Sequence, residues 1–112
     1  MRNTTRREAE RAYLMGVELR GRETLFDIED SLSELAQLAD TAGIEVAGRD
    51  IQRLAAPHAG TYIGSGKAEE IAQLKAELGF NLVIFDDELS PAQLRNLEEV
   101  IACKILDRTA LI

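Results

Sequence analysis

The sequence contains very few of the residue types that build reactive centres. It has one cysteine, one histidine and no tryptophan among its 112 residues. A single cysteine excludes an intrachain disulfide and a cysteine-based zinc site, and the lone His58 argues against any histidine-based one. No Ser–His–Asp triad can be argued either, since His58 would be the only base. A chain without disulfides fits a reducing compartment, so we expect a cytoplasmic protein.

Positive charge and long apolar runs are also scarce. The chain has 13 Lys and Arg against 20 Asp and Glu, which gives a formal net charge of −7. Bulk electrostatics therefore opposes sequence-independent attraction to nucleic acid or anionic lipid, and only a local basic patch would attract RNA. No apolar run approaches the length of a membrane span, and the N-terminus is charged where a signal peptide is apolar. We expect no membrane span.

What the chain does have is the composition of one globular domain. It is 46% hydrophobic and 29% charged, both ordinary values, and its length suits a single domain. The polar residues 1–10 predict a flexible tail, and residues 11–112 predict a single α/β domain. Residues 109–112 look like the beginning of a further element, so we expect a domain excised from a longer protein.

Strand and helix patterns alternate along this domain. Strands are predicted at residues 12–19, 44–48, 61–63, 82–85 and 104–106. Helices are predicted behind a capping box of Ser31 and Glu34, over residues 67–78, and behind a second capping box of Ser90 and Gln93. No helix fits between the second and third strands, so we expect these two to pair antiparallel. The result is an α/β fold with a mostly parallel sheet, helices packed on it, and the order β-α-β-β-α-β-α-β.

Residues 61–70, TYIGSGKAEE, look like a phosphate-binding loop. The P-loop pattern is G-x-x-x-x-G-K-S/T. Counting back from the Gly-Lys pair places Thr61 where the first glycine belongs, and Ala68 replaces the hydroxyl that binds magnesium. Glu69 and Glu70 are expected in the first helical turn, where they would repel a phosphate. These features favour a structural turn. The alternative is a nucleotide site at Gly64, Ser65, Gly66 and Lys67.

Acidic residues directly follow the most apolar strand. In open α/β sheets ligands collect at the carboxyl ends of the strands, so Asp86 and Asp87 are candidates for holding magnesium or accepting a phosphoryl group. Response-regulator receivers, however, carry their acid pair after the first strand, where this chain has Leu19-Arg20-Gly21-Arg22. The simpler interpretation is a solvated loop that leads into Ser90. The expected antiparallel pairing also places residues 61–70 at the opposite sheet edge from Asp86.

Arginines follow the first two strands. If these strands are parallel neighbours, their ends lie together, and the arginines there would form a local surface that contacts RNA phosphates. The alternative is dispersed solubilising charge. The candidate contacts are Arg20, Arg22, Arg49, Arg53 and Arg108.

Three longer stretches together resemble one known family. They are ELAQLADTAGIEVAG at residues 34–48, TYIGSGKAEEIAQL at 61–74, and NLVIFDDELSPAQLRNLEEV with KILDRTALI at 81–100 and 104–112. They are similar to the N-terminal domain of HflX, a family of translation-associated GTPases. The resemblance covers residues 12–112, and the string FDDELSPAQLRNLE is far more specific than the short motifs above.

The resemblance implies that this domain and a separate GTPase domain have different roles within a longer protein. In the family, a helical linker and a GTPase domain with its GTP and magnesium follow the segment matched by Asp107-Arg108-Thr109. The domain itself would then have no cofactor and no catalytic activity. Its implied partners are the large ribosomal subunit and its RNA, together with its own linker and GTPase domain, and the implied role is splitting stalled ribosomes under stress. ATP binding attributed to this end of some members corresponds to the nucleotide alternative above. One departure is Ala102-Cys103, where the family commonly has a glycine.

Overall fold

The computed structural model describes residues 9–21 and 27–112, so most of the predicted tail lies outside the described residues. Strands and helices alternate through the described part. The elements are β1 (Arg11–Leu19), α1 (Ile28–Thr41), β2 (Glu45–Leu54), α2 (Ser65–Leu78), β3 (Leu82–Phe85), α3 (Pro91–Ile101), β4 (Lys104–Asp107) and the 3-10 helix η1 (Arg108–Leu111).

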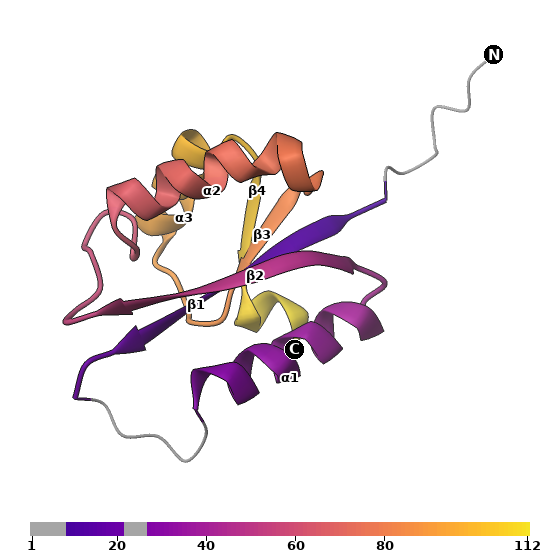
Figure 1. The fold of residues 1–112 in the computed structure, drawn as a ribbon, viewed down its shortest axis with the longest axis horizontal. Coiled ribbons are helices and arrows are strands. Elements are labelled where there is room, and N and C mark those ends of the chain that lie inside the picture. Colours follow the sequence, from indigo (N-terminus) through magenta and orange to yellow (C-terminus); the bar gives the residue numbers. More distant parts are fainter. Residues whose placement is uncertain (1–8, 22–26) are drawn as a thin grey trace.

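The sheet has the order β2-β1-β3-β4, and every neighbouring pair is parallel. Figure 1 shows α1 and η1 on one face of the sheet and α2 and α3 on the other. Successive residues of β1 alternate between the two apolar clusters: Met15 packs toward α2 and α3, and Leu14 toward α1. The predicted α/β fold, with helices packed on a sheet, is confirmed.

The central strand β3 is the most deeply buried part of the sheet. All of its residues, Leu82 to Phe85, are buried, as expected for a strand covered on both faces. The outer strand β2 and its neighbour β1 are much longer, with 10 and 9 residues against 4 for β3. The carboxyl ends of β1 and β2 therefore extend past β3.

The predicted third strand and its antiparallel pairing are absent from the described residues. β2 continues to Leu54, past its predicted end at Gly48, and α2 then carries the chain over to β3. Residues 61–63 form only an isolated antiparallel bridge, Tyr62 with His58, closed by backbone hydrogen bonds of 2.8 and 3.0 Å. Pro57 and Gly60 belong to this small turn and do not separate two strands. The observed order is β-α-β-α-β-α-β.

One predicted helix cap is wrong and one is confirmed. α1 begins at Ile28, because Asp27 is its N-cap and accepts a hydrogen bond from the Asp30 amide at 2.8 Å. Ser31, predicted as the cap, is already inside the helix. In α3, Ser90 and Gln93 form the predicted capping box.

The C-cap of α3 is Ala102, in the region where the resembling family commonly has a glycine. Ala102 adopts a left-handed conformation, with φ of 62°, which glycine usually occupies. The ammonium of Lys75 in α2 donates to the carbonyl oxygens of Ile101 and Ala102 at 2.9 and 2.8 Å. Contacts from α2 therefore satisfy the exposed carbonyls of this helix end.

Candidate functional site

The glycine-rich stretch forms the beginning of α2. The helix starts at Ser65 with Gly64 as its N-cap, and its first turn contains no acidic residue. Glu69 and Glu70 therefore lie beyond the first turn, and the prediction that they occupy it is wrong. The error is one of register, because the helix begins two residues earlier than its apolar pattern indicates.

Side chains of β2 hold this stretch against the sheet. The Lys67 ammonium lies 2.7 Å from a carboxylate oxygen of Asp50 and 3.3 Å from one of Glu70. The hydrogen bond that Lys67 donates to Asp50 raises the pKa of Lys67 above its ordinary value, in spite of partial burial. The Gly64 amide donates to the Gln52 side chain at 3.0 Å. The lysine that a phosphate would need is thus already committed to two carboxylates.

A second polar cluster lies on the α1 face, at the carboxyl end of β3. The guanidinium of Arg108 donates to the buried carboxylate of Asp86 at 2.7 and 3.1 Å, and to Glu34 at 2.8 Å. The Ser31 hydroxyl donates to the other Asp86 oxygen at 2.6 Å. Burial lowers the pKa of Arg108, but hydrogen bonds and charge from Asp86 and Glu34 outweigh it, and the pKa is raised on balance. We call these four side chains the Arg108 cluster.

The Arg108 cluster leaves little room for a magnesium ion at Asp86. Both carboxylate oxygens of Asp86 already accept hydrogen bonds, and a metal would have to displace Arg108 or Ser31. In the residues that the structure describes, no group of three or more His, Cys, Asp or Glu side chains is placed to hold a metal. Asp87, the other candidate, is only partly buried.

The glycine stretch and Asp86 lie on opposite faces of one sheet edge. Because β2 and β3 run parallel, the glycine stretch after β2 and Asp86 after β3 both follow the carboxyl end of a strand. The prediction that they lie at opposite edges of the sheet is therefore wrong. Lys67 nevertheless binds Asp50 on the α2 face, while Asp86 contacts Ser31 on the α1 face. The sheet itself separates the two, so they do not converge on one site.

The predicted arginine contacts are only partly brought together. Arg49 and Arg53 both project toward α1: Arg49 contacts Glu29 at 3.5 Å, and Arg53 contacts Glu18 of β1 at 2.6 Å. Arg20 is exposed at the end of β1, where its backbone amide bonds to β2. Arg108 is held inside its cluster, and Arg22 lies outside the described residues. Arg49, Arg53 and Arg108 thus each face a carboxylate.

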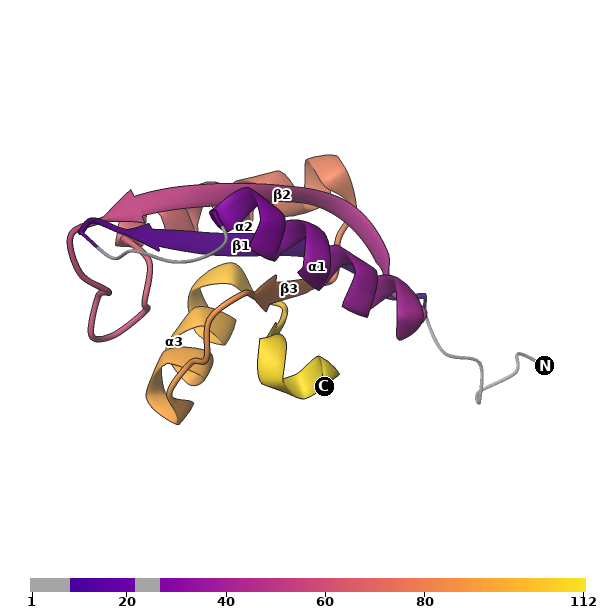
Figure 2. The same ribbon diagram turned by 90° about the horizontal axis from the view of Figure 1, so that it is seen from below.

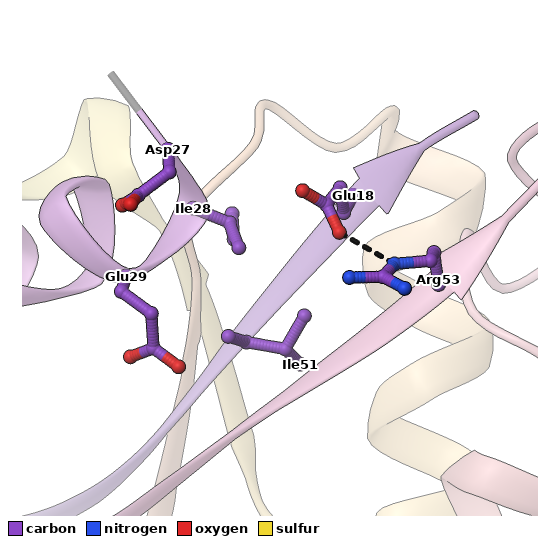
Figure 3. A pocket seen from close by; sticks show the side chains of 6 residues that line it. All are labelled: Glu18, Asp27, Ile28, Glu29, Ile51 and Arg53. Atoms are coloured by element: carbon purple, nitrogen blue, oxygen red, sulfur yellow. Dashed lines mark hydrogen bonds and ion pairs between the residues drawn. The ribbon is translucent and has the colours of Figure 1, made fainter. Parts of the chain in front are cut away.

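A groove of about 420 Å³ lies beside the Arg53–Glu18 pair (Figure 3). Its lining residues are Glu18, Asp27, Ile28, Glu29, Ile51 and Arg53. Every charged group that lines it has a partner within the protein: Glu18 pairs with Arg53, Glu29 pairs with Arg49, and Asp27 caps α1. A charged ligand would have to compete with these contacts, so the groove is a poor ion site.

Sequence reasoning missed the two amide side chains that connect α3 to the loop after β2. The Gln93 amide donates to the carbonyls of His58 and Ala59 at 3.2 and 3.3 Å, and the Asn96 amide donates to the carbonyl of Gly60 at 2.9 Å. Gln93 and Asn96 are three residues apart, so they lie on neighbouring turns on one side of the helix. This spacing is the only sign of their shared role in the sequence.

Comparison with known proteins identifies the family. The family described as "GTP-binding GTPase N-terminal" matches residues 29–112. The chain belongs to the N-terminal domain of the HflX family. It is 46% identical over 85 residues to GTPase HflX of Flavobacterium psychrophilum, covering 76% of this chain and 21% of that protein. It is 37% identical over 112 residues to GTPase HflX of Alkalihalophilus pseudofirmus, covering 100% of this chain and 26% of that protein. The predicted HflX resemblance is confirmed.

The fold also has a counterpart among solved structures. A GTP-binding protein from Sulfolobus solfataricus, solved in complex with GDP, superposes with a TM-score of 0.62 at 19% identity, covering 91% of this chain and 28% of that one. At this identity the likeness establishes the fold alone. The chain spans about a fifth to a quarter of the length of the two HflX relatives. Within the described residues, no helix is long and apolar enough to cross a membrane.

Proposed function

We propose that this chain is the accessory N-terminal domain of a GTP-hydrolysing HflX protein of the cytoplasm, and that it engages the large ribosomal subunit and its RNA. The family match over residues 29–112 carries this proposal. The relatives bear the name GTPase HflX, and the chain corresponds to about a fifth to a quarter of their length. GTP hydrolysis, with its magnesium, is assigned to the remainder of the full-length protein. The domain itself is assigned a binding role in ribosome splitting or rescue under stress.

The contacts of Lys67 support a non-catalytic role for the domain. Its ammonium is turned to Asp50 and Glu70, and its side chain is only 16% exposed. A phosphate at Gly64–Lys67 would need the lysine to leave both carboxylates. The glycine stretch therefore acts as a fixed turn between β2 and α2, which positions the exposed loop that precedes it.

Ribosomal-subunit cosedimentation tests the proposed function. The full-length protein that contains this domain is compared with a form that lacks it, against purified large and small subunits. We expect the full-length protein to pellet with large subunits, and deletion of the domain to weaken that binding. Equal binding with and without the domain would rule out a role for it in engagement.

One observation keeps the nucleotide alternative testable: the first turn of α2 carries no acidic residue. Under this alternative, the domain binds ATP at Gly64, Ser65, Gly66 and Lys67. Titration with ATP and magnesium would then show saturable binding that a Gly66→Glu variant loses. Gly66 has no neighbouring atom within 4 Å of an added Cβ, so this change tests the site without disturbing packing. We expect no binding at millimolar ATP.

A further inference from the structure

We infer that the domain contacts RNA through the loop at residues 55–60 and the first two turns of α3, and not through the arginines beside α1. We call this the loop–α3 surface. Figure 2 shows the loop after β2 descending beside α3. This inference rests on the proposed function, because it names the surface by which the domain would meet ribosomal RNA.

The first argument is the distribution of acidic residues. The chain has 20 Asp and Glu among its 112 residues, yet neither type occurs in residues 51–68 or in residues 89–97. The two stretches are distant in sequence, and the amides of Gln93 and Asn96 join them in space. Because these two stretches carry no carboxylate of their own, a chain of net charge −7 meets less local repulsion from a polyanion there than at its acidic segments.

The second argument is that the loop is exposed and yet held in one shape. All of residues 55–60 are exposed. The His58–Tyr62 bridge closes the loop, the buried Tyr62 anchors its end, and three carbonyls of the loop accept hydrogen bonds from α3. A loop that is ordered in advance loses less conformational entropy when it binds. Such a fixed, protruding loop is suited to docking.

The third argument is the state of the arginine on this surface. Arg95 is exposed in α3 beside Asn96, and no acidic residue in the described chain forms an ion pair with it. Glu98 and Glu99 follow Arg95 by three and four residues in α3, but neither lies within ion-pair distance of it, so its guanidinium can meet a phosphate oxygen without first leaving a carboxylate. By contrast, Arg49 and Arg53 must first leave Glu29 and Glu18.

The opposite face supplies the contrast that favours RNA over a protein partner. The start of α1 carries the acidic residues Asp27, Glu29 and Asp30, and Glu18 lies on the same side of the sheet. These carboxylates would repel phosphate and would suit a basic protein. An RNA partner is therefore assigned to the loop–α3 surface.

The test measures binding of the full-length protein to purified large subunits at several salt concentrations. Two variants change the loop–α3 surface: Ala59→Glu and Arg95→Glu, both at exposed positions. Two matched controls make the same changes of charge on the other face: Gln37→Glu on the exposed side of α1, and Arg53→Glu in β2. Thermal unfolding of all four confirms that each is folded.

We expect Ala59→Glu to weaken binding by about fivefold and Arg95→Glu by about tenfold, with the salt slope of Arg95→Glu reduced by about one. Gln37→Glu and Arg53→Glu should stay within about twofold of the unaltered protein. If Arg53→Glu weakens binding as much as Arg95→Glu, the inference is overturned and the α1 side is the contact. If the unaltered protein does not bind large subunits at all, the proposed function fails and the inference falls with it.

Discussion

The two faces of this sheet differ in how their arginines are paired at the same carboxyl edge, although Lys67 on the α2 face is itself paired with Asp50. On the α1 face, Arg49, Arg53 and Arg108 each lie against carboxylates from α1, from β1 or from Asp86 just after β3. On the α2 and α3 face, neutral amides of Gln93 and Asn96 hold the loop after β2 in place. One face neutralises its arginines internally, and the other leaves Arg95 exposed to solvent.

The difference teaches that arginines at strand ends do not by themselves make a basic surface. The parallel pairing of β1 with β2 places Glu18 directly opposite Arg53, and α1 packs so that Glu29 reaches Arg49. Cross-strand neighbours of opposite charge attract each other and form pairs. Candidate RNA contacts are therefore better judged by the partners of each arginine than by the number of arginines at strand ends.

The largest effect on stability is expected from Arg108→Ala. The change leaves the Asp86 carboxylate, whose side chain is 7% exposed, without its cation. Removing one partner of a buried ion pair is costly, and we expect the free energy of unfolding to fall by about 3 kcal/mol. Urea unfolding followed by circular dichroism measures this loss.

A double variant tests whether the stability lost in Arg108→Ala comes from the unpaired charge of Asp86. Asp86→Asn combined with Arg108→Ala removes the buried charge as well as its partner, so it should recover part of the stability lost in Arg108→Ala alone. If the double variant is less stable by the sum of both single changes, the two residues are not coupled. The Arg108–Asp86 pair would then contribute little to the stability of the fold.

A smaller loss is expected on the other face from Lys67→Met. Asp50, whose side chain is 30% exposed, loses its nearest cation but keeps access to water. We therefore expect a loss of about 1–2 kcal/mol in urea unfolding. Because Asp50 raises the pKa of Lys67, the pair stabilises the fold below the ordinary lysine pKa and loses that effect as pH rises through the folded value. A difference between variant and parent that persists above both pKa values would contradict the pairing.

The sequence predicts the layers of this fold well and the polar contacts poorly. The buried strand β3 and the α3 capping box could be predicted, because apolar runs and cap residues act through neighbours in sequence. The antiparallel pairing at residues 61–63 failed because a short local bridge at Tyr62 looks like a strand in the sequence. The Ser31 cap failed because the hydroxyl instead donates to Asp86, 55 residues away. Partners so distant in sequence leave no periodic signal.

The smallest effect is expected from Arg53→Gln, and it tests whether burial or geometry decides the strength of these pairs. The Arg53–Glu18 contact, at 2.6 Å, is as short as the Arg108–Asp86 contact at 2.7 Å. The Arg53 side chain is 76% exposed, however, against 20% for Arg108. Water screens the exposed pair, so the loss in unfolding free energy should be at most about 0.5 kcal/mol. A loss as large as that of Arg108→Ala would mean that distance outweighs exposure. The arginines beside α1 would then be too firmly paired to reach any partner.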